Sequence, residues 1–182
     1  MSYIPLILTA SRCLGGLFIV PICVLGLMPS SLVGSMLTSA VFALLALTDY
    51  FDGLLARKLN SQSAIGRVFD PLADKMLVFG ILIPFVSLNM WFCWPALFLF
   101  FRDLLVLGAR TIAAEAGAIV TVSQSAKYKT TLQLIVLSVL PIAYWLDGII
   151  YILLYVVVWF TVLLSYISCY DYCKRARLLH LN

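Results

Sequence analysis

The sequence predicts an all-α membrane protein with six transmembrane helices. The composition is far more apolar than that of a soluble domain, and apolar runs of about 20 residues, the length of a membrane span, recur along the chain. The basic residues fall into segments that six spans would place on one side of the membrane. These observations indicate one transmembrane domain over residues 1–182.

The composition excludes a soluble globular domain. Apolar side chains make up 64% of the 182 residues, charged side chains make up 11%, and the mean hydropathy is +1.09. Soluble domains carry about 25% charged residues. The net charge of +4 lies along one predicted membrane face. We therefore expect membrane lipids and phosphorylated substrates as partners, and no nucleic acid.

The first three helices follow from apolar runs and polar breaks. Residues 4–27 form the first run, with no basic residues ahead of it and no small-residue cleavage pattern behind it, so we expect a span and no removable signal peptide. A second helix is expected at about 32–55. A polar loop at 60–63 follows, and a third helix begins near Gly66.

The uncharged stretch at 76–101 could be one long helix or the halves of two. A turn at 87–91 divides it into helices at 66–88 and 92–116. Two more are expected, one at 130–145 that extends back towards Lys127 and one at 149–172. With six helices and the N-terminus inside, the connections near Pro29, Asn89 and Asp147 face outward and contain no Lys or Arg. A five-helix arrangement would place the last basic clusters on opposite sides, so the positive-inside rule favours six.

Four of the eight acidic residues lie between Asp49 and Asp74. Asp49 and Asp52 are three residues apart near the end of the second helix. Asp70 and Asp74 are four apart near the start of the third, so each pair shares a helical face. The short connection makes the two helices antiparallel neighbours. Four converging carboxylates repel one another unless a cation lies between them, and hard oxygen ligands select Mg²⁺ or Mn²⁺.

Small residues lie among these aspartates. Capping or interfacial roles could explain one aspartate pair, because carboxylates stabilise helix N-termini. Both pairs together with Gly53, Ala56 and Gly66 favour a pocket, since small side chains leave room for a ligand. Close packing between membrane helices is the alternative explanation for the small residues.

Together these residues form the pattern Asp49-x-x-Asp52-Gly53-x-x-Ala56-Arg57, eight further residues, then Gly66-x-x-x-Asp70-x-x-x-Asp74. This pattern resembles the signature of the CDP-alcohol phosphatidyltransferase family. The resemblance implies the six-helix fold of that family, a homodimer, and two Mg²⁺ or Mn²⁺ ions at a site open to the cytoplasm. There a hydroxyl would attack the β-phosphorus of a CDP-linked lipid and expel CMP.

The resemblance also implies roles for single residues. Asp49, Asp52 and Asp70 would be metal ligands, and Asp74 would be both a ligand and the catalytic general base. A base must lose its proton near neutral pH, and neighbouring dications keep a carboxylate ionised. The residues implied in binding the CDP-lipid are Thr9, Gly53, Ala56, Arg57, Ser63 and Gly66.

A second set of basic residues bears on the acceptor alcohol. Arg102 lies about 15 Å into the fourth helix, a depth that requires an aqueous cavity or a partner carboxylate. In the alternative explanation, Arg102 only forms an ion pair with Asp103, and Lys127 and Lys129 only set the membrane topology. The Arg102–Asp103 ion pair is disfavoured because adjacent helical residues do not face each other. The expected ligands of an acceptor phosphate are Lys75, Arg102, Arg110, Lys127 and Lys129.

Local blocks narrow the resemblance to the bacterial members of the family that make phosphatidylglycerophosphate. Tyr3 and Leu6 depart from those enzymes, which usually have Asn there; Asp103 replaces the usual Glu, and Ala126 the usual Gly. The similar blocks are Tyr3-Ile4-Pro5 with Leu8-Thr9 and Arg12, the segment from Asp70 to Lys75, Arg102-Asp103 with Arg110, and the segment from Ala126 to Thr130.

The resemblance implies transfer of the phosphatidyl group from CDP-diacylglycerol to sn-glycerol 3-phosphate in phospholipid biosynthesis. CMP would be released, at the cytoplasmic face of a bacterial inner membrane. Serine, inositol phosphate, or phosphatidylglycerol in a cardiolipin-forming reaction are alternative acceptors. A divalent-cation transporter with the aspartates as its selectivity site is the alternative from another class. Aspartates clustered at one end beside arginines disfavour it.

Overall fold

The computed structural model of the chain describes residues 4–59, 64–115, 124–146 and 148–180, with side chains at 9–48, 72–109, 129–146, 148–170 and 174. This part of the chain is helical and contains no strand. Its elements are α1 (Ile4–Leu14), a π-helical turn (Gly15–Ile19), α2 (Val20–Ile22), a second π-helical turn (Cys23–Leu27), α3 (Leu32–Leu59), α4 (Ala64–Leu88), a 3₁₀ turn (Met90–Phe92), α5 (Cys93–Glu115), α6 (Gln124–Ala143) and α7 (Ile149–His180).

The predicted all-α fold is confirmed. The segments from α1 to the second π-helical turn follow one another without a break, so the described residues form six helices. Three helices extend further than predicted: α3 ends at Leu59, α6 begins at Gln124 and α7 ends at His180. The predicted bounds followed the apolar runs, whereas a helix can continue with polar residues beyond the length needed to cross the hydrocarbon core.

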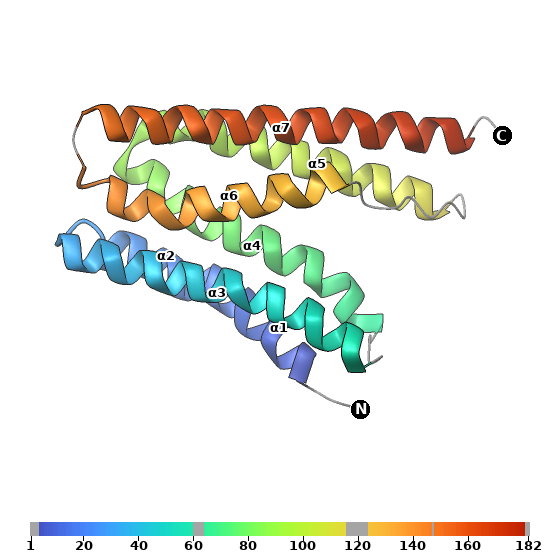
Figure 1. The fold of residues 1–182 in the computed structure, drawn as a ribbon, viewed down its shortest axis with the longest axis horizontal. Helices are drawn as coiled ribbons and strands as arrows, with labels where there is room; N and C mark the ends of the chain where they lie inside the picture. Colours follow the sequence, from blue (N-terminus) through green and yellow to red (C-terminus); the bar gives the residue numbers. More distant parts are fainter. Residues whose placement is uncertain (1–3, 60–63, 116–123, 147, 181–182) are drawn as a thin grey trace.

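Successive helices run in opposite directions, so their ends gather at two ends of the bundle (Figure 1). We call one of these the site end. It carries the start of α1, the end of α3 at Leu59, the start of α4 at Ala64, the end of α5 at Glu115, the start of α6 at Gln124 and the end of α7. The opposite end is the far end. The helix ends at the site end carry most of the basic residues, as the positive-inside pattern predicts: Arg57, Lys58, Arg67, Arg110, Lys127, Lys129, Lys174, Arg175 and Arg177.

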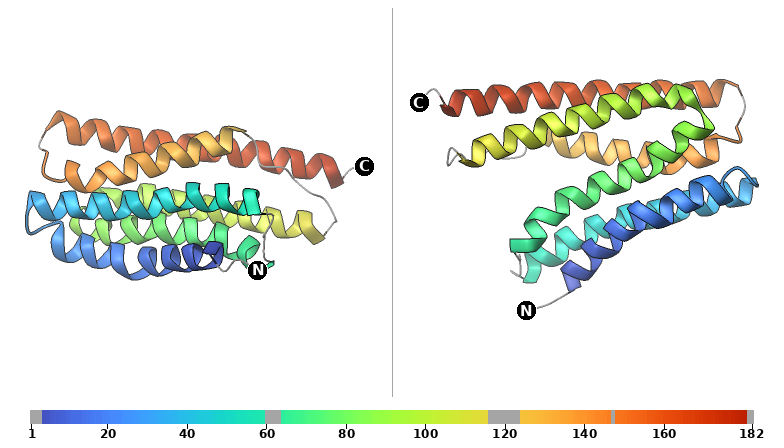
Figure 2. Two further views of the ribbon diagram at one scale, coloured as in Figure 1. Left: turned by 60° about the horizontal axis from the view of Figure 1, so that its bottom comes forward. Right: turned by 180° about the vertical axis from the view of Figure 1, so that it is seen from behind.

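The bundle consists of two groups of helices, one made of α1, α3 and α4 and the other of α5, α6 and α7. In the first group α1 packs along α3 and α4, and in the second α5 and α6 pack along α7. The contact between α3 and α6 joins the two groups. Front and back views show that α4 leans away from α5 and α7 toward the site end (Figures 1 and 2). Long side chains are therefore needed to connect α4 with α5 at this end.

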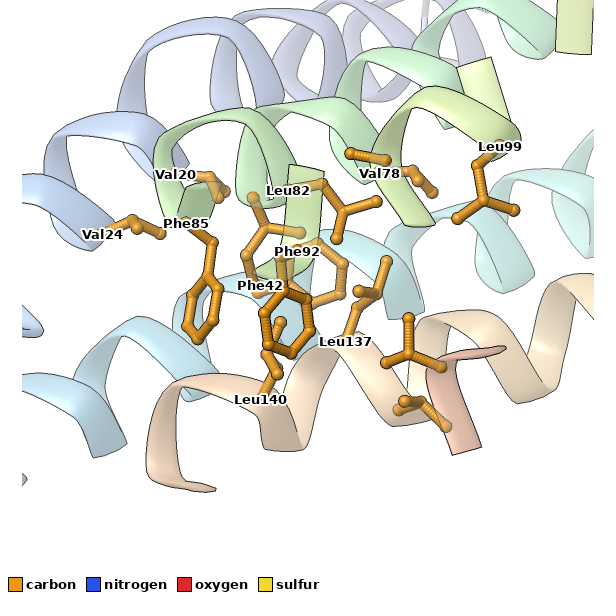
Figure 3. Close-up of a cluster of buried hydrophobic side chains, with 14 of the residues drawn as sticks. Val20, Val24, Phe42, Val78, Leu82, Phe85, Phe92, Leu99, Leu137 and Leu140 are labelled. Atoms are coloured by element: carbon orange, nitrogen blue, oxygen red, sulfur yellow. The ribbon is translucent and has the colours of Figure 1, made fainter. Parts of the chain in front are cut away.

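The apolar core draws on all six helices. Four fully buried side chains meet in it: Phe42 of α3, Phe85 of α4, Phe92 of the 3₁₀ turn and Leu140 of α6 (Figure 3). The rings of Phe85 and Phe92 meet edge to face with 4.8 Å between their centroids. The outer surface is apolar as well, since side chains such as Phe101 are 57% exposed. A bundle that is apolar inside and outside is suited to lipid.

Three helical segments of the described residues are long and apolar enough to cross a membrane: Thr9–Leu27, Met90–Ala109 and Ile149–Tyr170. Leu32–Thr48 and Lys129–Ala143 are apolar over shorter lengths. These lengths and the apolar surface identify a membrane protein. The count of six membrane spans stays a prediction.

Side-chain hydrogen bonds tie the helices together at the far end. The indole Nε1 of Trp145 donates to the carbonyl oxygen of Met28 at 3.0 Å, which links the end of α6 to the end of the first helix. The side-chain amide of Asn89 donates to the hydroxyl of Tyr151, which links the α4–α5 connection to α7. The two helix groups are therefore joined at the far end by polar contacts as well as by the core.

Two glycines allow the first helix to pack closely on α4. A Cβ atom on Gly16 would lie 2.8 Å from the amide nitrogen of Leu77, and one on Gly80 would lie 1.9 Å from the carbonyl oxygen of Gly16. Neither glycine can be replaced unless the two backbones separate. This contact positions Arg12, one turn before Gly16, against α4.

Replacing Gly16 by alanine is expected to destabilise the protein by about 1–3 kcal/mol, because the added methyl group forces the α4 backbone away. Gly26 provides a matched control in the same helix, since nothing lies within 4 Å of its Cβ position. Gly26→Ala should leave stability unchanged or slightly higher. Thermal unfolding in detergent micelles measures both variants. Equal stability of the two would contradict the close contact.

Candidate active site

The structure places both aspartate pairs at the site end. Asp49 and Asp52 lie within the last three turns of α3, and Asp70 and Asp74 lie within the first three turns of α4. α3 ends and α4 begins at the same end of the bundle, as predicted from the short connection between them (Figure 1). The side chains of Asp49, Asp52 and Asp70 lie outside those that the structure describes.

The carboxylate of Asp74 is held by an arginine of the first helix. Arg12 Nη1 donates to Asp74 Oδ1 at 2.8 Å. The side chain of Arg12 is fully buried, whereas that of Asp74 is 34% exposed. A buried guanidinium requires an anionic partner. Arg12 therefore fixes the direction of the Asp74 carboxylate, which remains partly accessible to a substrate.

Arg12 is a candidate functional residue to which the sequence analysis gives no role. It appears there only within the similar block at the start of the chain. Arg12 is the one charged residue among positions 1–48. A charge inside a membrane span marks a functional site by default, so this signal was available. Its partner, 62 positions further along the chain, could not be identified from local spacing.

A second group of charged side chains begins one residue after Asp74. We call it the cation cluster: Lys75, Arg102 and Lys129 around the carboxylate of Asp103. Lys75 Nζ lies 2.6 Å from Asp103 Oδ2, and Arg102 Nη1 lies 2.9 Å from Asp103 Oδ1. Lys129 is 4% exposed and lies within electrostatic range of the other three. α4, α5 and α6 thus each contribute one cation.

Arg102 does pair with its neighbour Asp103, so the expectation that adjacent helical residues would not meet was wrong. The reason is a second contact: Arg102 Nε donates to the carbonyl oxygen of Ser165 on α7 at 2.9 Å. This bond fixes the long side chain with its Nη1 atom beside Asp103. Among the described residues, the hydrogen bonds of Arg102 are those to Ser165 and Asp103.

The cation cluster favours binding of an anion. When its three basic groups are protonated, the described side chains leave an excess of two positive charges around one carboxylate. Arg102 and Asp103 are 7% and 8% exposed, so water screens this charge poorly. A phosphate monoester carries about −1.5 to −2 charges near pH 7 and three strong acceptor oxygens. A phosphate monoester can therefore neutralise the excess positive charge of the cluster and accept hydrogen bonds from its donors.

Other residues predicted for the acceptor lie nearby along the backbone. Arg110 is on α5 and Lys127 on α6, both further toward the site end than the cation cluster, with side chains outside the described ones. Lys129 is buried within the cluster, which favours a role beyond membrane topology.

The residues predicted to bind the CDP-lipid also lie at the site end where they are described. Thr9 is 2% exposed and shares a face of α1 with Arg12, three positions later. Ser63 lies outside the described residues. The helix backbone carries the remaining four near the end of α3 and the start of α4, with side chains that are not described: Gly53, Ala56, Arg57 and Gly66.

A model of the CDP-alcohol phosphatidyltransferase family matches residues 2–167. A protein of Rickettsia felis named CDP-diacylglycerol–glycerol-3-phosphate 3-phosphatidyltransferase is 32% identical over 176 residues, which are 96% of this chain and 95% of that protein. The protein of the same name from Rickettsia typhi is 33% identical over 97% of this chain and 98% of its own length. One from Bacillus subtilis is 37% identical over 100 residues, 55% of this chain and 52% of that protein.

The chain belongs to the CDP-alcohol phosphatidyltransferase family. The resemblance inferred from the aspartate pattern is thereby confirmed, and the protein is an enzyme of this class. Membership of the family argues against the cation transporter considered from the sequence.

Proposed function

We propose that the enzyme transfers the phosphatidyl group of CDP-diacylglycerol to sn-glycerol 3-phosphate. The observation that carries this choice of acceptor is the cation cluster, which begins at Lys75, directly after Asp74. A phosphate bound there would keep the rest of a small acceptor near the Asp74 carboxylate. The names of the relatives agree with this acceptor.

The donor set fits a divalent metal. Asp49, Asp52, Asp70 and Asp74 supply only hard oxygen ligands from two antiparallel helices, and divalent-metal dependence is general in the family. These four residues would hold two Mg²⁺ or Mn²⁺ ions, which when bound neutralise the charge of the pyrophosphate and of the departing CMP.

Asp74 acts as the general base in the proposed reaction. The acceptor hydroxyl oxygen forms a bond to the phosphorus on the lipid side of the pyrophosphate, and the bond from this phosphorus to the oxygen of CMP breaks. Asp74 takes the hydroxyl proton while Arg12 holds its carboxylate in place. Arg57, Thr9 and Ser63, with Gly53, Ala56 and Gly66, bind the CDP-lipid.

The site end lies at the cytoplasmic face of a bacterial inner membrane in this proposal, and the enzyme works as a homodimer. The basic segments next to the site end support the orientation through the positive-inside rule. The lipid tails of CDP-diacylglycerol stay in the bilayer while both headgroups react at the membrane surface.

An acceptor panel tests the proposal. Purified enzyme receives radiolabelled CDP-diacylglycerol with sn-glycerol 3-phosphate, glycerol, serine, inositol phosphate or phosphatidylglycerol, and the lipid products are separated. We expect phosphatidylglycerophosphate as the main product and little product with glycerol, which is the same acceptor without the phosphate. Faster product formation with any other acceptor would overturn the proposal.

A pair of lysine variants tests the phosphate site within the same assay. Lys129→Ala should raise the KM for glycerol 3-phosphate roughly 10- to 100-fold, because a charged hydrogen bond contributes about 1.5–3 kcal/mol. The KM for CDP-diacylglycerol should not change. Lys174→Ala is the matched control, since Lys174 is an exposed lysine of α7. Equal effects of the two changes would exclude a specific phosphate contact at Lys129.

A further inference from the structure

Asp103 holds cations from two different helices. Its Oδ2 atom contacts Lys75 of α4 at 2.6 Å, and its Oδ1 atom contacts Arg102 of α5 at 2.9 Å. Each carboxylate oxygen therefore has a separate cation, and the separation of the two cations is set by the width of one carboxylate. Two cations held in this way present a phosphate with donors at fixed positions.

The same carboxylate connects helices that otherwise diverge. α4 leans away from α5 toward the site end (Figure 2). The Lys75–Asp103 ion pair spans the two helices. Arg102 extends the connection to α7 through the carbonyl oxygen of Ser165. Because Lys75 follows Asp74 on α4, Asp103 also determines how far the cation cluster lies from the proposed base.

We propose that Asp103 is a positioning residue that fixes the acceptor phosphate relative to the Asp74 carboxylate. It acts through Lys75 and Arg102 and does not touch the reacting atoms. This inference rests on the proposed function, because it requires an acceptor with a phosphate. It assigns the anionic member of the cation cluster, which the sequence analysis did not include among the site residues.

Asp103→Asn separates positioning from simple attraction of the phosphate. Without the carboxylate, Lys75 and Arg102 are no longer held apart at a fixed distance, so a bound acceptor is misaligned. We expect kcat with glycerol 3-phosphate to fall roughly 10- to 100-fold, the range of losses caused by a misplacement of about 1 Å. The change also removes the negative charge of the cluster. Inorganic phosphate should therefore inhibit at the same or a lower concentration than in the unchanged enzyme.

The experiment measures kcat, the KM for both substrates and the inhibition constant of inorganic phosphate, each per folded molecule in detergent micelles. Asp103→Glu keeps both ion pairs within reach and should recover most of the rate. Leu140→Ala, which shortens a fully buried core side chain near the far end of α6, is the control for stability loss and should leave kcat unchanged. An unchanged kcat in Asp103→Asn, or an inhibition constant that rises with the loss of rate, would overturn the proposal.

The two proposals fail in different ways. If the unchanged enzyme uses an acceptor without a phosphate, the proposed function fails and the role of Asp103 fails with it. If the unchanged enzyme requires glycerol 3-phosphate and Asp103→Asn keeps its kcat, only the role of Asp103 is wrong.

Discussion

Asp74→Asn is expected to remove turnover of CDP-diacylglycerol. Loss of a general base alone lowers rates by roughly 10²- to 10⁴-fold, and the amide is also a poorer metal ligand. The change leaves the fully buried guanidinium of Arg12 without its counter-charge, which can cost about 3–5 kcal/mol of stability. CMP release must therefore be measured per folded molecule, with the folded fraction taken from size-exclusion chromatography.

Two further variants separate the base from the ion pair. Arg12→Gln removes the same ion pair but keeps the carboxylate, so part of the turnover should remain. The double variant Arg12→Gln with Asp74→Asn removes both charges and should fold better than Asp74→Asn alone, yet still lack turnover. Turnover in the double variant close to that of Arg12→Gln would exclude Asp74 as the base.

Removal of divalent ions is expected to abolish the reaction completely. Treatment with EDTA should stop CMP release, and added Mg²⁺ or Mn²⁺ should restore it, because four carboxylates that converge as proposed would need a dication before they could bind a pyrophosphate. The added ion should also raise the unfolding temperature, since it binds the folded state. NaCl at equal ionic strength is the control and should restore neither. A full rate in EDTA would contradict the metal site.

Most of the fold could be predicted from the sequence, because a membrane helix has a length set by the bilayer and an apolar composition. The split of residues 76–101 was decided by charge, and the structure has the break there, with α4 ending at Leu88 and α5 beginning at Cys93. The extension of α7 to His180 was not predicted, because an apolar run does not indicate how far a helix continues outside the membrane. The approach of Gly16 to Gly80 was also missed, because it joins residues 64 positions apart.

The positions of the aspartates on their helices were predictable because they depend on local spacing. The aspartate pairs lie at helical intervals that the sequence shows directly, and their helices were found as expected. Arg12 and Asp103 form ion pairs with residues of other helices, and no local pattern reveals these partners. Asp103 was misjudged for a further reason: a rule for adjacent residues on one helix omits the Ser165 carbonyl of α7, which redirects the Arg102 side chain.

The far-end hydrogen bonds restrict how this bundle can move. Trp145 is bonded to Met28 and Asn89 to Tyr151, and bonds of this kind are costly to break in an apolar setting. Neighbouring helices cannot slide lengthwise past each other without losing them. Admission of a two-tailed lipid or departure of its product is therefore expected to tilt α4 against α5 about the far end as a pivot. The acyl chains would then pass sideways between helices, while the water-soluble acceptor arrives from the end of the bundle.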